Sequence, residues 1–414
     1  MKLSLVGEEM SAMSGVRSIL KDIAEHAARQ SLINLSAGNP LVLPEVEHLW
    51  RKHLSELMED AAFGEIIGRY GSSQGYEPFI ETVVEMINRN YNWGITAKNV
   101  LVTAGSQSLY FMAVNAFTGM DKDGRPRRLV LPLCPDYTGY QGVSFWKKTV
   151  VSFKPVVDVL GEHRFKHRLD LDRLTIDGMT GAVLFSRPCN PSGNVMTERE
   201  VLELIHRSRS RDVPVIIDSA YAPPFPNLSF IEMRPIWGDN VIHCLSLSKA
   251  GLPGERIGVA IAHERYIRIL ESFQANMNIH PSRLGQAIAA RAIRSGELEA
   301  VAAKVIRPFY EKKFRVLEAA LDQCMPDVPW YLHVGEGSIF AWVWFDRLPI
   351  RDLELYQLLK KEGLIVVPGF SFFQGLREAW DHTNQCIRIS LTASDEEIEQ
   401  GVRILAKVLR EIYR

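Results

Sequence analysis

Short apolar runs alternate with helical patterns through the middle of the chain, and this alternation restricts the fold more than any other feature. Most of these runs are apolar on both faces, and helical patterns at 106–117 and 197–211 follow two of them. Strands of this kind predict a mostly parallel sheet with helices covering both faces. The runs with strand composition are residues 99–105, 127–133, 181–188, 213–221, 240–248 and 256–262.

The C-terminal part of the 414-residue chain has a different rhythm. Residues 307–325 have the pattern of a long amphipathic helix, and shorter strands are expected at 338–345 and 386–391. This change predicts a second, smaller α+β domain that also takes in the N-terminal arm. The predicted boundaries are 1–60 for the arm and part of the small domain, 61–295 for the large domain, and 296–414 for the C-terminal small domain.

Composition excludes several classes of partner. The 48 basic and 49 acidic residues are interspersed and give a formal net charge of −1, so neither nucleic acid nor an anionic membrane is an expected partner. The five cysteines are scattered and have no CxxC spacing, which indicates reduced thiols and no metal site. The N-terminus has acidic residues where a signal peptide carries its apolar core, and no segment reaches the roughly 18 apolar residues of a membrane span. These features predict a cytoplasmic protein.

Residues 246–256, with the sequence SLSKAGLPGER, carry the most specific chemical signal. They place Lys249 among small residues and hydroxyls, with Arg256 seven positions later. An unprotonated lysine with open surroundings can form a Schiff base with an aldehyde, while Ser246, Ser248 and Arg256 can hold a phosphate. Together these groups suit pyridoxal phosphate (PLP), although such a run taken alone is also compatible with a solvated loop.

Two upstream segments could contact the same cofactor. Residues 105–108 lie at a strand-to-helix junction, where the helix N-terminus favours an anion, so Ser106 and Gln107 could cradle the phosphate. Tyr137 follows another predicted strand and could stack on a flat ring. Each segment has a plainer interpretation, a helix N-cap for the first and turn packing for the second.

Two further strand ends supply polar groups of the right kind. Asn190, within residues 187–194, could donate from its amide to a phenolate oxygen, and Tyr221 could bond the same oxygen. Asp218 ends an apolar strand, where a carboxylate needs a partner to offset its desolvation. A protonated pyridine nitrogen is such a partner. Each group alone could be a turn or a cap, but their order along the chain favours one shared site.

From GNP at 38–40 to RIS at 388–390, the chain resembles the PLP-dependent aminotransferases of fold type I, the aspartate aminotransferase fold. The resemblance implies an α/β large domain with a mostly parallel seven-stranded sheet covered by helices, plus a smaller α+β domain from both chain ends. It implies that Lys249 forms the Schiff base with PLP. The cofactor-binding residues implied by the motifs are Ser106, Gln107, Tyr137, Asn190, Asp218, Tyr221, Ser246, Ser248, Lys249 and Arg256.

The same resemblance implies contacts with substrate and with a second subunit. Arg388 is expected to clamp the substrate carboxylate, Asn190 to border the substrate, and Gly38 to close over the same carboxylate. Tyr70, in RYGSSQG, is expected to reach the PLP phosphate of a partner subunit, which predicts a homodimer.

Longer segments are similar to one branch of this family, which exchanges amino groups between valine and pyruvate. That similarity implies transamination of a small or branched aliphatic L-amino acid with a 2-oxo acid, giving 3-methyl-2-oxobutanoate and alanine from valine and pyruvate. The alternatives are an aminotransferase of other specificity, for alanine and glutamate or for aromatic substrates, and a PLP-dependent lyase or synthase on the same fold. The similar segments are 4–20, 33–45, 220–227, 367–376 and 380–390.

Two questions stay open at this level. Phe370, Phe372 and Phe373 could line a pocket for an apolar substrate side chain, or they could equally belong to the core. A regulatory protein that uses the fold as a ligand sensor is a third class of function, and the absence of an added basic DNA-binding segment argues against it.

Overall fold

The computed structural model describes residues 2–11 and 32–414, and its central element is a sheet of eight strands. The strand order is β2-β11-β10-β9-β8-β4-β3, and β5 also pairs with β4. Neighbouring strands are parallel except where β11 meets β10 and β2, and where β3 meets β4. The bounds are β2 (Val100–Thr103), β3 (Gly119–Met120), β4 (Pro126–Leu131), β5 (Val150–Ser152), β8 (Thr180–Ser186), β9 (Val215–Asp218), β10 (Val241–Ser246) and β11 (Gly258–Ala262).

This sheet confirms the predicted α/β class and has one strand more than the seven implied by the resemblance. The additional strand is β3, whose two residues fold back antiparallel on the first two residues of β4. All six strand-like runs of the sequence contain a strand of this sheet. The short strand β5 was not indicated by any of the patterns.

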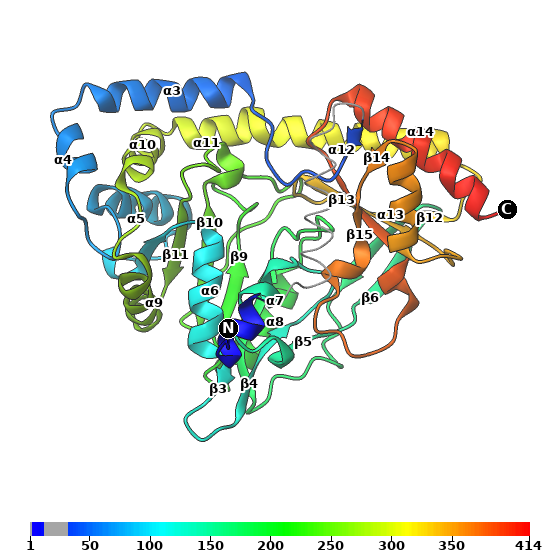
Figure 1. Cartoon of the computed structure of the whole chain (residues 1–414). Helices are drawn as coiled ribbons and strands as arrows, with labels where there is room; N and C mark the ends of the chain where they lie inside the picture. The colour runs from blue at the N-terminus through cyan, green and yellow to red at the C-terminus, as the bar shows by residue number, and fades with distance from the viewer. Residues whose placement is uncertain (1, 12–31) are drawn as a thin grey trace.

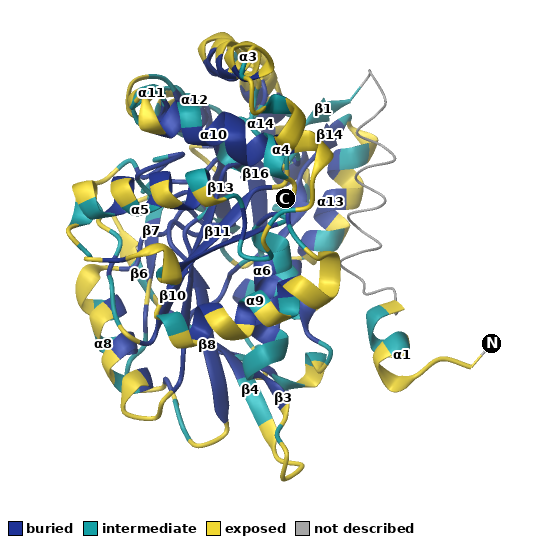
Figure 2. Ribbon diagram, turned by 90° about the vertical axis from the view of Figure 1, so that its left-hand side faces the viewer, coloured by how far each residue is buried: buried dark blue, intermediate teal, exposed yellow. Residues whose placement is uncertain are grey.

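Helices cover both faces of the large sheet, which explains why its strands are apolar throughout. Along β8, Ala182 and Leu184 pack with α6 (Ser106–Phe117) and α9 (Glu264–Asn278), whereas Val183 and Phe185 pack with α8 (Glu198–Arg209). Figure 2 shows the buried strands between these two layers of helices. Successive side chains of a strand point to opposite faces, so in a sheet that is buried on both sides nearly every strand position is apolar.

Local sequence signals set the ends of the main helices. The predicted helix at 197–211 is α8, which begins after a capping box in which Thr197 and Glu200 bond each other's backbone N–H groups. The predicted helix at 106–117 is α6, with the same bounds. The other helices are α1 (Leu5–Ser11), α3 (Pro44–Met58), α4 (Phe63–Gly68), α5 (Glu77–Tyr91), α7 (Gly139–Val143), α10 (Arg283–Arg294), α11 (Glu297–Val301), α12 (Arg307–Cys324), α13 (Asp352–Lys361) and α14 (Asp395–Ile412).

A second sheet of six strands has the order β15-β16-β13-β12-β7-β6. The expected strands at 338–345 and 386–391 are β13 and β16, and α12 runs in Figure 1 from the side of α10 to α14. Two strands come from the middle of the chain, an arrangement that no sequence pattern indicated. The bounds are β6 (Val156–Leu160), β7 (Arg164–Arg168), β12 (Trp330–His333), β13 (Phe340–Phe345), β15 (Val367–Pro368) and β16 (Cys386–Ser390).

The N-terminal segment joins the C-terminal part through a short parallel pair of strands. Here β1 (Ile33–Asn34) pairs with β14 (Leu364–Ile365). The domain boundaries at 60 and 295 stay predictions, and residues 12–20 of the similar segment 4–20 lie outside the described residues. Within the described part of the chain, each helix is too short or too polar to cross a bilayer.

Buried histidines are a notable feature of the second sheet. His167, His333 and His382 lie within 6 Å of the Phe165 ring, measured between ring centroids. Burial lowers the pKa of His333 and of His382 to about 3, and it lowers the pKa of His167 well below its usual value. These side chains are therefore neutral in the folded protein over the whole physiological range.

We predict that this cluster makes the protein acid-labile. Below a pH of about 6.5 the unfolded chain binds a proton at each of these histidines and the folded chain does not, so the free energy of unfolding falls as the pH falls. Each histidine should contribute about 1 kcal/mol of this loss between pH 7 and 5.5. Urea unfolding at the two pH values should show a smaller loss in His382→Phe than in the wild type, and equal losses would contradict the prediction.

Candidate active site

A cavity of about 250 Å³ lies where the large sheet meets the second sheet. Its polar groups come largely from segments directly after β2, β8, β9 and β10, the edge at which open α/β sheets bind ligands. It brings together every predicted site residue except Tyr70. The lining residues are Gly38, Ser106, Gln107, Tyr110, Tyr137, Asn190, Asp218, Ala220, Tyr221, Ser246, Ser248, Lys249, Arg256, Phe340 and Arg388.

Tyr70 lies apart from this cavity. Its side chain is 82% exposed, and the edge of its ring meets His280 at a centroid distance of 5.7 Å. Within the single chain it contributes nothing to the site. The contact with a partner subunit that the resemblance implied therefore stays a prediction.

Lys249 follows β10 on a single 3₁₀ turn, Ser248–Ala250. Its Nζ donates to the carbonyl oxygen of Gly38 at 2.7 Å. Burial, together with the cationic side chains of Arg388 and Arg256, lowers the pKa of Lys249 to about 8. A lower pKa increases the fraction of unprotonated amine, which is the form that attacks an aldehyde.

An anion cradle lies at the start of α6. Gly105 precedes the helix with φ +88°, no side chain caps the helix, and Ser106 is its first residue. The Arg256 guanidinium lies so close that a Cβ on Gly105 would be 2.4 Å from its Nη2. Arg256 also donates from Nη1 to the Ser248 hydroxyl at 3.4 Å. Helix N–H groups, a guanidinium and hydroxyls at one point are a suitable site for a phosphate.

Asp218 ends β9 with its carboxylate buried at the cavity. One oxygen accepts from the Tyr140 hydroxyl at 2.8 Å and the other from the backbone N–H of Ala220 at 3.0 Å. Burial raises the pKa of Asp218, while the hydroxyl of the buried Tyr110, these hydrogen bonds and the Lys249 ammonium oppose the rise.

Arg388 enters the cavity from β16. Its Nη1 donates to the Asn190 Oδ1 at 3.1 Å and its Nη2 to the Ser36 carbonyl at 3.0 Å, while its buried Nε has no partner. The guanidinium lies 3.9 Å from the ring centroid of Phe340. Burial lowers the pKa of Arg388 to about 10, so it is still a cation at neutral pH. Among the residues that the structure describes, no carboxylate pairs with it.

A buried carboxyl that sequence reasoning missed connects two sides of the cavity. Asp136 accepts from the backbone N–H groups of Tyr137 at 2.7 Å and Ser186 at 3.1 Å, and from the Ser186 hydroxyl. The same hydroxyl accepts from the backbone N–H of Asn190 at 3.2 Å. Burial raises the pKa of Asp136 to about 7. Asp136 therefore couples the position of Tyr137 to that of Asn190.

The three phenylalanines of residues 370–373 do not line the cavity. Phe372 and Phe373 are buried in the core, and Phe370 is half-buried. Phe372 still contacts the site indirectly, because its ring centroid lies 5.3 Å from the Arg388 guanidinium. Of the two roles considered for these residues, the structure favours packing.

Comparison with known proteins identifies the family. The sequence profile of "Aminotransferase class I and II" matches residues 30–405. The chain belongs to this aminotransferase family. A valine–pyruvate aminotransferase of Escherichia coli (strain K12) is 35% identical to this aminotransferase over 413 residues, which cover 100% of this chain and 99% of that relative.

Solved structures agree with the assignment. A putative amino-acid aminotransferase from Psychrobacter arcticum 273-4 is similar to this aminotransferase with a TM-score of 0.95 and 33% identity, over 100% of this chain and 99% of the other. A valine–pyruvate aminotransferase from Salmonella typhimurium LT2 has a TM-score of 0.88 and 32% identity, over 97% and 100% of the two chains. The aminotransferase fold therefore extends over the whole chain.

Aminotransferases of this fold use PLP, and the residues of the cavity fit it. The cradle of Gly105, Ser106 and Arg256 suits the phosphate, Asp218 suits the pyridine nitrogen, and Lys249 suits the aldehyde.

We predict that Gly105→Ala weakens PLP binding at least about tenfold, because a Cβ there displaces Arg256 from the helix N-terminus. Absorbance titration of the apoenzyme with PLP measures the affinity directly. Gly124→Ala is the matched control, since Gly124 also has positive φ, at +74°, but a Cβ there meets nothing within 4 Å. Equal affinities for the two variants would contradict the proposed cradle.

Proposed function

We propose that this aminotransferase transfers the amino group of valine, or of a similar small or branched aliphatic amino acid, to pyruvate. The observation that carries the proposal is the buried Arg388 guanidinium, which has no carboxylate partner among the described residues and lies beside Lys249 and Arg256 in one cavity. These are the three cationic side chains of the described lining. Each has a role toward PLP or the substrate α-carboxylate, so the described lining of a single chain offers no further cation for a second substrate carboxylate. The 35% identity to a valine–pyruvate aminotransferase supports the same specificity.

We infer the following division of labour. When bound, PLP supplies an aldehyde that takes up the amino group and a ring that withdraws electrons from the substrate. Arg388 binds the substrate carboxylate by paired N–H donors and so orients the Cα–H bond. Asn190 keeps Arg388 in place through its Oδ1, and Asp218 holds a proton at the ring nitrogen.

Lys249 acts as the general base. With PLP and substrate bound, its free amine would take the proton from the substrate Cα and hold it for return, and PLP would supply the electron-withdrawing ring that makes this proton acidic. Its lowered pKa, about 8, suits a group that both accepts and donates a proton near neutral pH. The Gly38 carbonyl, which also lines the cavity, accepts from this amine at 2.7 Å.

The test is a half-reaction followed by absorbance. L-valine added to the holoenzyme without a 2-oxo acid should abolish the visible band of bound PLP, and pyruvate should restore it. Lys249→Ala should lose turnover by at least about 10³-fold, because no other amine of the described lining can move the proton. Lys98→Ala is the matched control, an exposed lysine on another 3₁₀ helix (Ala97–Asn99). A band that responds only to other amino acids would contradict the valine assignment, and turnover by Lys249→Ala would contradict the mechanism.

We propose further that the enzyme is a cytoplasmic homodimer. All five cysteines are free thiols, which agrees with a reducing compartment. The phenol of Tyr70 is exposed and outside the cavity of its own chain, as expected of a group that serves the cofactor phosphate of a partner subunit. Under this proposal each active site needs Tyr70 from one chain and Lys249 from the other.

Mixing two inactive variants tests the shared site. Tyr70→Ala and Lys249→Ala should each have little activity alone. After co-expression at equal levels they should recover about a quarter of wild-type activity, because half of the dimers are mixed and each mixed dimer has one intact site. Activity no higher than the sum of the two separate variants would contradict the proposed contribution of Tyr70.

A further inference from the structure

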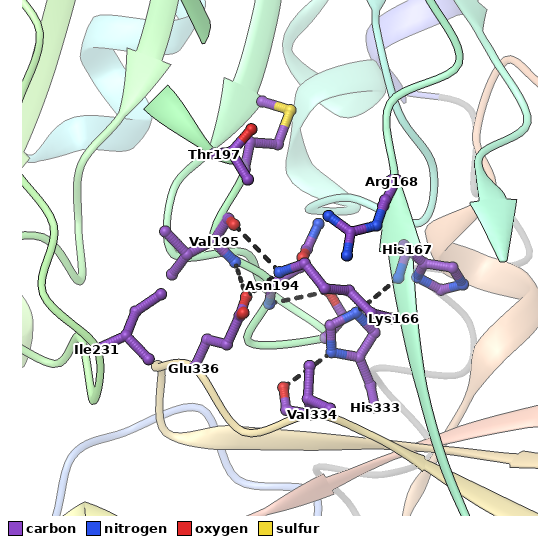
Figure 3. Close-up of polar contacts among 12 residues, drawn as sticks. Lys166, His167, Arg168, Asn194, Val195, Thr197, Ile231, His333, Val334 and Glu336 are labelled. Atoms are coloured by element: carbon purple, nitrogen blue, oxygen red, sulfur yellow. Dashed lines mark hydrogen bonds and ion pairs between the residues drawn. The ribbon is translucent and has the colours of Figure 1, made fainter. Parts of the chain in front are cut away.

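A buried ion pair outside the cavity forms hydrogen bonds with the backbone of one residue, Val195. Lys166, on β7, and Glu336, in the link between β12 and β13, form an ion pair with side chains only 8% and 15% exposed. The Glu336 carboxylate also accepts from the backbone N–H of Val195 at 2.9 Å, and the Lys166 ammonium donates to the Val195 carbonyl at 3.3 Å. Figure 3 shows the two charged side chains converging on Val195. Both polar groups of one peptide segment are therefore held by the same pair.

Val195 is connected to the active site by a tight turn. The backbone N–H of Cys189 donates to the Asn194 carbonyl at 2.9 Å, and that of Gly193 donates to the Cys189 carbonyl at 2.8 Å. A Cβ on Gly193 would lie 2.5 Å from the carbonyl oxygen of Gly337, so the turn packs directly on the segment that carries Glu336. A shift at Val195 therefore moves Asn190 as well.

The second sheet thus contacts this turn at two points. Inside the cavity, Arg388 of β16 bonds the Asn190 side chain. Outside it, Lys166 and Glu336 bond Val195. Both contacts come from strands or links of the same sheet, and together they set where Arg388 lies relative to Asn190.

We propose that Lys166 and Glu336 are positioning residues for the substrate carboxylate site, an inference that rests on the proposed function. A buried ion pair is favourable only when further hydrogen bonds support it, and here the Val195 backbone gives one to each partner. The pair fixes the turn against the second sheet, and this keeps the Arg388 guanidinium in the geometry that receives a carboxylate. Neither residue lines the cavity, so neither contacts the substrate.

The test uses the holoenzyme and 3-methylbutanoate, a carboxylate without an amino group, which binds but does not react. Glu336→Gln should weaken its binding, and raise the KM for valine, by at least about tenfold, because small misplacements of binding groups are costly. The kcat should change less, and the visible absorbance of bound PLP should be kept. Lys166→Met should have the same effect.

Two further variants separate positioning from general stability. Glu318→Gln is the matched control. Glu318 forms an ion pair at 3.0 Å with Arg164, which lies on β7 like Lys166, but Glu318 does not contact the turn that carries Asn190 and Val195. It should bind 3-methylbutanoate as the wild type does, with any change in Tm comparable to that of Glu336→Gln. The double variant Lys166→Met/Glu336→Met leaves no unpaired buried charge. It should still bind 3-methylbutanoate weakly, because Val195 has lost both contacts.

Unchanged affinity in Glu336→Gln and Lys166→Met would overturn the inference. So would an equal loss in Glu318→Gln, or full recovery in the double variant. A wild-type enzyme that binds 3-methylbutanoate but does not transaminate valine would contradict the proposed function alone, since carboxylate binding is measured separately from turnover.

Discussion

The buried guanidinium of Arg388 is the interaction on which the organisation of the site depends. It extends from the second sheet, pairs with no carboxylate among the described residues, and contacts Asn190, Ser36 and the face of the Phe340 ring. A charge removed from water in this way is costly unless a counterion arrives. The π face of Phe340 offsets part of the cost, on the order of 1 kcal/mol. The Arg388 guanidinium therefore favours binding of an anion at its own position, between the two sheets and the N-terminal segment.

The charges of Asp218 and Lys249 are likewise modified by burial and by neighbouring groups. The Asp218 carboxylate is bonded by Tyr140 and by the backbone of Ala220, and burial alone would favour its protonated form. A cationic ring nitrogen bound beside it would favour the ionised form. Lys249 shows the converse case, since neighbouring cations and burial favour its neutral amine. Burial therefore favours the neutral form of both groups, a free amine at Lys249 and a protonated carboxyl at Asp218, and a cationic partner would be needed to keep Asp218 ionised.

Local sequence predicts the large sheet and most of this site because both depend on short-range patterns. A strand that is buried on both faces is apolar throughout, and the groups that follow it must lie at one edge of the sheet. The hairpin of β6 and β7 could not be recognised in this way, since β7 has the sequence RFKHR and becomes a buried strand only by pairing with β12, over 160 residues later. The role of Phe340 could not be predicted from local sequence either. It belongs to an apolar strand, and nothing local distinguishes a core phenylalanine from one that supports a guanidinium.

Asp136 and Glu336 illustrate a second reason for what sequence reasoning missed. Each is a carboxylate that accepts, besides its other contacts, from a backbone N–H group far away in the chain, at Ser186 for Asp136 and at Val195 for Glu336. A backbone partner leaves no mark on the sequence of the partner residue, so no motif records the contact. Both carboxylates nevertheless bind the segment around Asn190, one at its start and the other just beyond its turn. Asn190, which lines the cavity, thus lies between two segments that are bonded by carboxylates that do not contact it. Asp136 follows a strand of the large sheet and Glu336 lies between two strands of the second sheet. The position of Asn190 therefore depends on how those two sheets pack together.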